Sequence, residues 1–339
     1  MTELPGLDLA RVGDWMDRTL PGLRSGELHA EIIQGGKSNL TYRVTDGVHV
    51  WALRRPPLGH VLPTAHDMSR EYRVVSALAD TDVPVASTAG LCTDPDVLGA
   101  PFYLMSYVDG VVLDRRERLA TLGRDAAGRV GAVLIDTLVA LHRIDPDEIG
   151  LGDFGRPAGF LERQVNRWFK QWQASETRPL PELTQVVDAL HVARPESGAP
   201  AIVHGDYRLT NVIYTADLSG IAAVVDWEMA TLGDPLTDVG LLVVYHHLAE
   251  AQELTMPIMR PADGFLSAEQ LAARYAAASG RELGELRWYV AFGYYKLAVV
   301  AEGIAARHLQ GKTVGPGYER FGEIVPMLLT SALEALEAS

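Results

Sequence analysis

The chain has 339 residues, of which 47% are hydrophobic and 22% charged, a balance typical of a globular protein with a sizeable core. Its formal net charge of −14 argues against a general nucleic-acid partner, because phosphate backbones are bound by dense Lys and Arg. The single cysteine, Cys92, excludes an intramolecular disulfide and fits a reducing compartment.

The start of the chain and its apolar runs predict neither export nor membrane insertion. The opening segment MTELPGLDLARVGDWM is acidic and interrupted, unlike a secretory signal. Runs such as VGLLVVY are far shorter than the roughly 20 residues that cross a bilayer. At roughly 100–200 residues per domain, the length suggests two lobes. We therefore expect a cytoplasmic protein of two lobes.

The first part of the chain is predicted to be rich in strands. A short helix is expected at residues 8–20, and residues 28–55 alternate in short apolar pieces broken by Gly-Gly and by Asp-Gly, a hairpin signal. Residues 65–80 predict a helix. Residues 101–110 predict a buried strand ending in a turn, and Val108–Asp109–Gly110 is the expected hinge.

Helical spacing dominates after that turn. Helices are predicted at residues 125–144, 160–175, 180–193, 285–309 and 320–337. We expect an α+β protein with a small β-rich lobe at residues 1–108, which includes the N-terminal helix and one main helix, and a larger, mostly helical lobe at residues 109–339.

Polar residues interrupt a strand-like pattern in IVHGDYRLTNVIY, residues 202–214. The two apolar runs VIYTA and IAAVV, joined by DLSG, predict an antiparallel hairpin with a loop at 217–220. In that register Asn211 lies directly opposite Asp226 at the open end of the hairpin. Opposed Cα atoms are about 4.5–5.5 Å apart, a separation from which two side-chain oxygens can converge on one ion.

The donor types indicate which ion. An Asn carbonyl and an Asp carboxylate are hard oxygen ligands that suit Mg²⁺, which completes its shell with water and substrate phosphates. Asp206 lies five residues before Asn211 and is not needed by that pair. A carboxylate beside a metal–phosphate site suits a base that accepts a proton from a substrate hydroxyl.

These motifs carry a family resemblance. HGDYRLTN followed by VVDWEMATLGDPLTDVG resembles the protein-kinase-like phosphotransferases of the aminoglycoside and choline kinase type. With VWALRRPP and LHRIDP added, the chain looks most similar to the branch found as stand-alone bacterial phosphotransferases and as domains fused to acyl-CoA dehydrogenases. The resemblance covers roughly residues 28–310 and implies a two-lobed, protein-kinase-like fold.

The resemblance also implies roles for individual residues. Asp206 would be the catalytic base, and Asn211 and Asp226 would bind magnesium. His204 would support the loop structurally, and Asp238 would brace it from within a helix.

A phosphate donor would be bound by the first lobe. Gly35 and Gly36 stand between strand-like runs, where backbone amides can approach phosphates, and Ser38 and Asn39 would lie near the β- and γ-phosphates. The letters GGKS are not a Walker loop, because Glu31 stands where that motif requires glycine.

Kinases hold the α- and β-phosphates with a strand lysine that is oriented by a helix glutamate. Arg54 and Glu71 stand at these positions, so the chain departs from the family's usual lysine. The strand at 101–110 would place backbone groups against the purine. The expected residues there are Met105, Ser106, Tyr107 and Val108.

Candidate contacts to the phosphate acceptor lie in the helical lobe. Arg208 belongs to the catalytic loop, Arg163 and Arg167 are four residues apart on a predicted helix, and Tyr295 lies on the long C-terminal helix. The arginine pair would suit an anionic acceptor, whereas the net negative charge would suit a cationic one.

The function expected from the sequence is transfer of the ATP γ-phosphate, with Mg²⁺, to a hydroxyl of a small metabolic molecule of the hydroxyacyl type. Three alternatives stay open. They are an aminoglycoside-type antibiotic kinase, a nucleotide-binding pseudokinase suggested by Arg54, and a non-enzymatic scaffold. The acceptor, the choice between ATP and GTP and the oligomeric state are not determined by the sequence.

Overall fold

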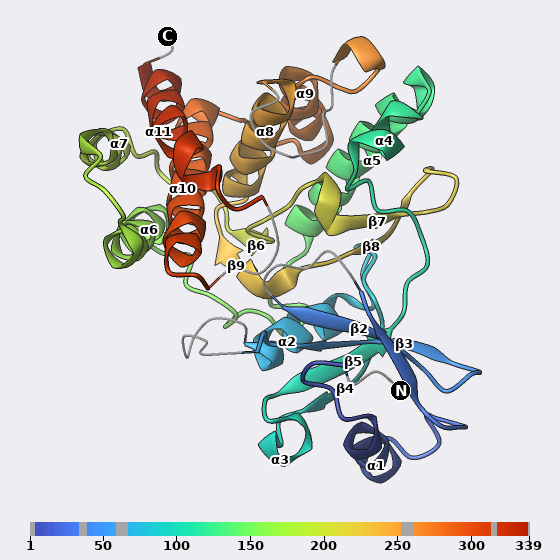
Figure 1. Cartoon of the computed structure of the whole chain (residues 1–339). Helices are drawn as coiled ribbons and strands as arrows, with labels where there is room; N and C mark the ends of the chain where they lie inside the picture. Colours follow the sequence, from blue (N-terminus) through green and yellow to red (C-terminus); the bar gives the residue numbers. More distant parts are fainter. Residues whose placement is uncertain (1–3, 34–38, 59–66, 252–260, 313–316, 338–339) are drawn as a thin grey trace. The chain divides into compact units, whose positions relative to one another are not determined.

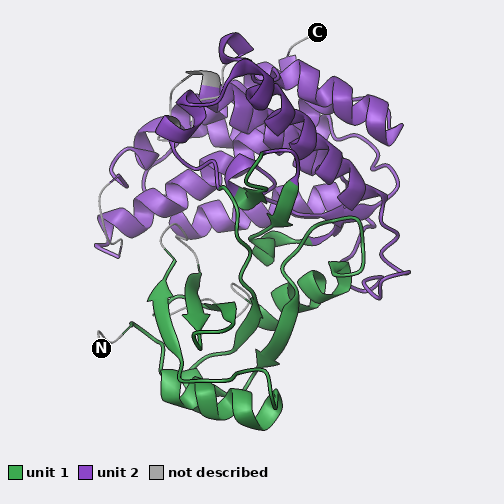
Figure 2. Ribbon diagram, turned by 90° about the vertical axis from the view of Figure 1, so that its right-hand side faces the viewer, with its two compact units in different colours: residues 1–111, 211–217, 221–230 green, residues 112–210, 218–220, 231–339 purple. Residues whose placement is uncertain are grey.

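The computed structural model describes residues 4–33, 39–58, 67–251, 261–312 and 317–337. The chain forms two compact units (Figures 1 and 2). Unit 1 comprises Met1–Val111, Asn211–Asp217 and Ile221–Ala230, and unit 2 comprises Val112–Thr210, Leu218–Gly220 and Thr231–Ser339.

A five-stranded antiparallel sheet forms the framework of unit 1. Its strands, in spatial order, are β1 (His29–Ile32), β2 (Leu40–Thr45), β3 (Val50–Arg55), β5 (Phe102–Ser106) and β4 (Thr88–Cys92). The turn between β2 and β3 is the expected Asp-Gly hairpin: Gly47 has φ +88°, and the Asp46 carboxylate accepts hydrogen bonds from the N–H groups of Val48 and His49.

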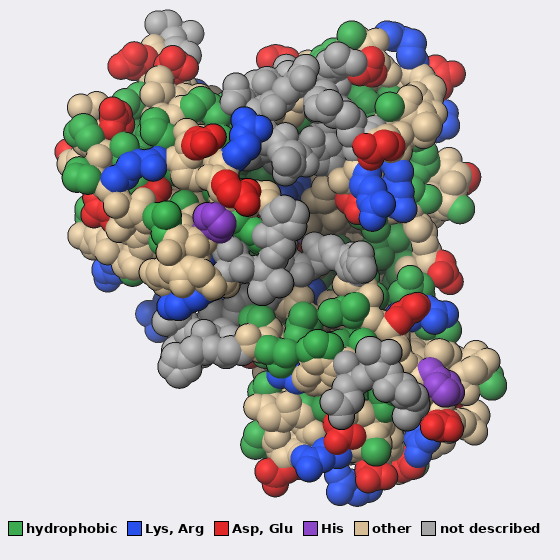
Figure 3. Space-filling view, in the orientation of Figure 1, with side chains coloured by type: hydrophobic (Ala, Val, Ile, Leu, Met, Phe, Trp, Pro, Cys, Tyr) green, Lys and Arg blue, Asp and Glu red, His purple; other side chains and the backbone are tan. Residues whose placement is uncertain are grey.

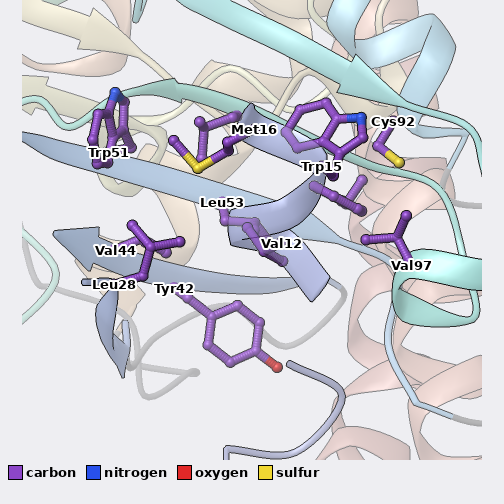
Figure 4. Packing of buried hydrophobic residues seen from close by; sticks show 12 residues of the cluster. Val12, Trp15, Met16, Leu28, Tyr42, Val44, Trp51, Leu53, Cys92 and Val97 are labelled. Carbon is purple, nitrogen blue, oxygen red and sulfur yellow. The ribbon is translucent and has the colours of Figure 1, made fainter. Parts of the chain in front are cut away.

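The helices α1 (Leu9–Thr19), α2 (Met68–Leu78) and α3 (Pro95–Leu98) accompany this sheet. Asp8 caps α1 through the N–H of Arg11, and Asp67 caps α2, so both helices begin at an acidic residue that satisfies free N–H groups. The apolar face of α1 packs onto the sheet (Figure 4). There Trp15 meets Phe102 edge to face at a centroid separation of 5.0 Å.

A hairpin from the middle of the sequence completes unit 1. Its strands are β7 (Val212–Tyr214) and β8 (Ile221–Val224), and the 3₁₀ helix η2 (Trp227–Met229) follows them. Val111 forms a bridge with Tyr214, and the N–H of Val224 donates to the Pro84 carbonyl at 2.8 Å. Gly110 lies so close to the Tyr214 carbonyl that no Cβ would fit there.

Within its described residues, unit 2 is mainly helical, with one small sheet formed by β6 (Ala201–Val203) and β9 (Thr231–Gly233). Its elements are α4 (Arg116–Ala120), α5 (Arg124–Arg143), α6 (Phe160–Ser175), α7 (Pro181–Val192), α8 (Leu236–Ala251), α9 (Ala268–Ser279), α10 (Leu286–Leu309) and α11 (Phe321–Glu337), with short 3₁₀ turns η1 (Leu209–Asn211) and η3 (Pro261–Asp263). The helix α10 packs against α6, α7, α8 and α11 (Figure 1). It is buried on most sides, as expected for a helix without a polar face.

The expected α+β class is confirmed, with an antiparallel sheet early in the chain and helices afterwards. The predicted helices are present as α1, α2, α5, α6, α7, α10 and α11. The strand β4 and the helix α9 were not predicted. The expected boundary puts the whole of 109–339 in one lobe, whereas the hairpin within 211–230 packs with unit 1.

Acidic and basic side chains are interspersed over the face shown in Figure 3. None of the described helices combines the length and the apolar character that a membrane crossing requires.

Candidate active site

The segment His204–Gly205–Asp206 follows directly after β6 in unit 2. Gly205 has φ +83°, a left-handed conformation that glycine adopts without strain. Asp238, in the first turn of α8, accepts hydrogen bonds from the backbone N–H groups of His204 and Gly205 at 2.7 and 2.8 Å. The loop is therefore held by the side chain of a distant helix.

Asp238 is itself fully buried, and His142 of α5 lies 3.2 Å from its carboxylate. Burial raises the pKa of Asp238, but the hydrogen bond with His142, its charge, the charge of His204 and the N–H of Gly205 outweigh this effect. The net direction is down, so the carboxylate stays ionised.

Side chains of unit 2 that contact the Asp206 carboxylate include Tyr245 and Arg208. The hydroxyl of Tyr245 donates to Oδ1 at 2.5 Å, and Nε of Arg208 lies 3.4 Å from Oδ2. The guanidinium of Arg208 also lies over the Tyr245 ring, 5.2 Å from its centroid. The N–H of Asp206 donates to His204 Nδ1 at 3.2 Å, so the buried imidazole of His204 is hydrogen-bonded to the backbone of the loop.

Tyr245 is a site residue that the motifs in the sequence do not predict. It follows Asp238 by seven residues on α8, so the two side chains share one face of the helix. This seven-residue spacing from Asp238 is the feature of the sequence from which Tyr245 could have been predicted.

Unit 1 brings together Arg54 of β3, Glu71 of α2 and Asp226. Arg54 Nε lies 2.9 Å from Glu71, and another guanidinium nitrogen lies 2.5 Å from Asp226. Burial lowers the pKa of Arg54, but the two carboxylates outweigh burial and raise it, so the residue is permanently charged. One buried cation thus joins the strand, the helix and the segment after β8.

The hairpin register differs from the expected one. Val212 pairs with Val224 and Ile213 with Ala223, then a bulge shifts Tyr214 onto Ile221. The prediction that Asn211 lies directly opposite Asp226 is wrong.

The reason is the connecting loop, which is longer than the expected four residues and includes Leu218 at φ +58°. The Asn211 carbonyl accepts instead from the N–H of Val225 at 2.9 Å. Asp226 leaves the strand in a left-handed conformation, φ +69°. Its side-chain direction is therefore set by this local backbone and not by strand pairing.

Asn39 begins the described chain after the glycine loop and is 2% exposed. Its Nδ2 donates to Glu228 at 2.9 Å, and its Oδ1 has no hydrogen-bond partner among the described residues. Glu228, two residues after Asp226, was not predicted as a site residue. The predicted phosphate-binding residues Gly35, Gly36 and Ser38 lie outside the described residues.

The predicted purine-contacting segment runs from β5 into the following turn. Met105 lies within the sheet, paired with Ala52 on β3. The N–H groups of Ser106 and Tyr107 donate to the carbonyls of Ser87 and Val50, at 2.8 and 3.3 Å.

Val108 differs from these neighbours, because its N–H makes no hydrogen bond within the described ranges.

The candidate acceptor residues have different surroundings in unit 2. The Arg163 guanidinium donates to the carbonyls of Arg156 and Ala158, just before α6. Arg167 lies 5.9 Å from the centroid of the Trp168 ring. Tyr295 is fully buried, and its hydroxyl donates to the Val165 carbonyl at 3.2 Å. Arg208 alone among the four directly adjoins Asp206.

No group of three or more His, Cys, Asp or Glu residues in the described part of the chain is arranged to hold a metal ion. The predicted magnesium ligands are one amide and one carboxylate, Asn211 and Asp226. Such a sparse set of oxygen donors fits Mg²⁺, which takes its remaining ligands from water and phosphate.

Sequence and structure comparisons agree on the family. A family described as phosphotransferase enzymes matches residues 29–289. The chain belongs to this phosphotransferase family. A protein from Ralstonia eutropha with the provisional name aminoglycoside phosphotransferase is 30% identical, with a TM-score of 0.83 over 97% of this chain and 98% of the other.

More distant phosphotransferases share the fold. The aminoglycoside phosphotransferase APH(4)-Ia, in a ternary complex with ADP and hygromycin B, is 15% identical, with a TM-score of 0.60 over 92% of this chain and 95% of that one. This likeness supports a kinase-like fold for the phosphotransferase described here.

Curated relatives are longer proteins. The probable acyl-CoA dehydrogenase IBR3 of Arabidopsis thaliana is 32% identical over 88% of this chain and 39% of its own length. The human acyl-CoA dehydrogenase family member 11 is 29% identical over 89% of this chain and 39% of its own length. This chain spans less than half of each of these relatives, and the match agrees with the branch that the sequence resembles.

Proposed function

We propose that this phosphotransferase is a kinase that transfers the γ-phosphate of ATP to a hydroxyl group of a small molecule. The observation that carries the proposal is the set of contacts that hold Asp206. Its backbone is fixed through Gly205 and His204 by the buried Asp238, while its carboxylate points to Tyr245 and Arg208. A carboxylate held in this way can accept a proton from a hydroxyl as the phosphoryl group is transferred.

Unit 1 would supply the nucleotide contacts. Arg54 can hold phosphate oxygens through its planar fork, and Glu71 keeps it in place. The N–H of Val108 would meet the purine, and Asn39, next to the glycine loop, would lie near the terminal phosphates.

Asn211 and Asp226 are the proposed magnesium ligands, a donor set that suits the ion. Magnesium would neutralise phosphate charge when bound. Because Asp226 already contacts Arg54, the magnesium ion and Arg54 would share the Asp226 carboxylate.

The acceptor is proposed to be a hydroxylated metabolite of the acyl type. Support comes from relatives named as acyl-CoA dehydrogenases and from the cationic Arg208 beside Asp206. An aminoglycoside is the second candidate, because a structural neighbour was solved with hygromycin B and the net charge of −14 would attract a cation. A catalytically silent pseudokinase is the third, because arginine stands where kinases usually have lysine.

The test is the Asp206→Asn variant. ADP release is measured with a panel of hydroxy acids, hydroxyacyl thioesters and aminoglycosides, and nucleotide binding is measured by calorimetry. We expect the substitution to lower kcat by about 10²–10⁴-fold, the usual contribution of a general base, while ATP affinity changes little.

The matched control is Asp188→Asn, which alters an exposed aspartate on α7 and should leave both quantities unchanged. Wild-type turnover in Asp206→Asn would remove the proposed base. Nucleotide binding without transfer to any acceptor in the wild type would favour the pseudokinase.

A further inference from the structure

Lys296 lies in the middle of α10, and nothing proposed above uses it. The residue is 8% exposed, between the fully buried Tyr295 and Ala298. Lysine is almost never buried to this extent unless its ammonium group has partners. The position of these partners indicates what the residue does.

The ammonium group donates to the carbonyl oxygen of Gly205, the residue immediately before Asp206. It also lies 5.3 Å from the centroid of the Trp168 ring of α6, a favourable position for a cation. Lys296 therefore connects α6 and α10 to the loop that carries the proposed base.

The peptide group that joins Gly205 to Asp206 is held at both ends. Its carbonyl accepts from Lys296, and its N–H, which belongs to Asp206, donates to His204 Nδ1. A peptide is planar, so two hydrogen bonds on opposite edges leave little freedom of rotation. The direction in which the Asp206 side chain leaves the backbone follows from this peptide.

Charged groups from three elements face the Lys296 ammonium. They are Asp206 on the loop, Asp238 on α8 and Arg167 on α6. Burial lowers the pKa of Lys296 below its usual 10.5, and Arg167 lowers it too, while the two carboxylates oppose this. The cation is thus placed next to the two carboxylates on which the loop depends.

We propose that Lys296 is a positioning residue for Asp206: it fixes the Gly205–Asp206 peptide and supplies a buried positive charge beside the base. The proposal rests on the proposed function of Asp206. Lys296 need not touch the acceptor or the nucleotide, so its removal should affect turnover more than substrate binding.

The experiment compares wild type, Lys296→Met, Lys296→Arg and Asp206→Asn by ADP release. Methionine keeps much of the length and loses the charge and the donor. We expect Lys296→Met to lower kcat by about 10–100-fold, with KM for ATP within about twofold, because a misdirected base slows the chemical step alone. Lys296→Arg keeps a charge and donors and should recover part of the loss.

A pH profile separates positioning from simple support of the fold. In the wild type, kcat should fall at alkaline pH as Lys296 loses its proton, at a lower pH than for an ordinary lysine. In Lys296→Arg the guanidinium stays charged, so the fall should move to higher pH. An alkaline fall at the same pH in both proteins would overturn the proposal, whether or not Lys296→Met folds.

Glu302→Gln is the control for disturbance of α10. Glu302 is fully buried on the same helix and accepts from the N–H and hydroxyl of Thr177, away from the loop. The Glu302→Gln substitution should change the thermal stability of the protein without changing kcat. If Asp206→Asn is inactive and Lys296→Met is as active as wild type, this inference fails and the function stands. If Asp206→Asn is fully active, the function itself fails.

Discussion

Arg54 shows how one residue can join distant parts of the sequence. Its side chain is 11% exposed and contacts Glu71, 17 residues away, and Asp226, 172 residues away. The Glu71 side chain is 1% exposed, so its carboxylate has little water to replace a lost partner. Breaking a buried ion pair by removing one partner leaves an uncompensated charge, and that cost exceeds the net worth of the pair.

Arg54→Met should therefore lower the free energy of unfolding by about 3–5 kcal/mol, measured by urea denaturation at pH 7. The matched exposed pair is Arg274 with Asp136, whose side chains are 43% and 49% exposed. Arg274→Met should cost less than about 1 kcal/mol. Equal losses in the two variants would contradict the importance of burial at Arg54.

At the scale of elements, α8 combines three buried groups with different neighbours. Asp238 binds the backbone of the catalytic loop, Tyr245 binds the side chain of Asp206, and His246 contacts the carbonyl of Leu242 within the helix. Asp238 and Tyr245 share a face because they are seven residues apart, which is two helical turns. Any change in how α8 packs would thus alter both contacts to the loop together.

His246 predicts how α8 responds to acid. Burial lowers its pKa to about 4, so the folded protein keeps the ring neutral, whereas the unfolded chain binds a proton below about 6.5. Stability from this group is present above pH 6.5 and is lost as the pH falls towards 4. The expected loss is about 3 kcal/mol.

Urea denaturation between pH 4 and 7 tests this expectation. His246→Gln removes the titrating group, so its free energy of unfolding should depend less on pH than that of the wild type. His29→Gln, which replaces an exposed histidine of β1, should retain the wild-type dependence. If the free energy of unfolding depends on pH in the same way in wild type and His246→Gln, the folded protein accepts a protonated His246 ring and the expectation is wrong.

At the scale of the whole molecule, unit 1 is discontinuous in sequence. The hairpin β7–β8 and η2 return about 100 residues after Val111 and contribute Val212, Tyr214 and Trp227, all buried. They also supply Asp226 and Glu228, the partners of Arg54 and Asn39. A fragment that ends at Val111 lacks both the apolar and the polar contacts of this hairpin.

Residues 1–111 expressed alone should therefore bind the dye ANS and lose near-ultraviolet circular dichroism, as exposed apolar surface and loose packing predict. The same fragment joined by a glycine–serine linker to residues 211–230 should bind less dye and unfold cooperatively. A cooperative, dye-free fragment 1–111 would mean that the hairpin is dispensable for unit 1.

The sequence predicted the helices well because apolar residues repeat with the helical period in α5 and α6, and because the segment of α10 is a long, mostly apolar run. It failed on the register of β7 and β8. Register depends on the length of the connecting loop and on bulges, and here the last pair is Tyr214 with Ile221 and a bulge precedes it. A shift of one residue in the pairing of β7 with β8 is enough to move Asn211 away from the position opposite Asp226.

The sequence by itself determined the family, the α+β class and the motif that contains His204, Asp206, Asn211, Asp226 and Asp238, because residue type and local spacing carry that information. The tertiary structure alone decided that Tyr245 and Lys296 meet the loop at Asp206, and that Arg54, which the sequence pairs with Glu71, also binds Asp226. These contacts join residues 39 to 172 positions apart, and the packing of helices and strands, which no local pattern records, brings them together.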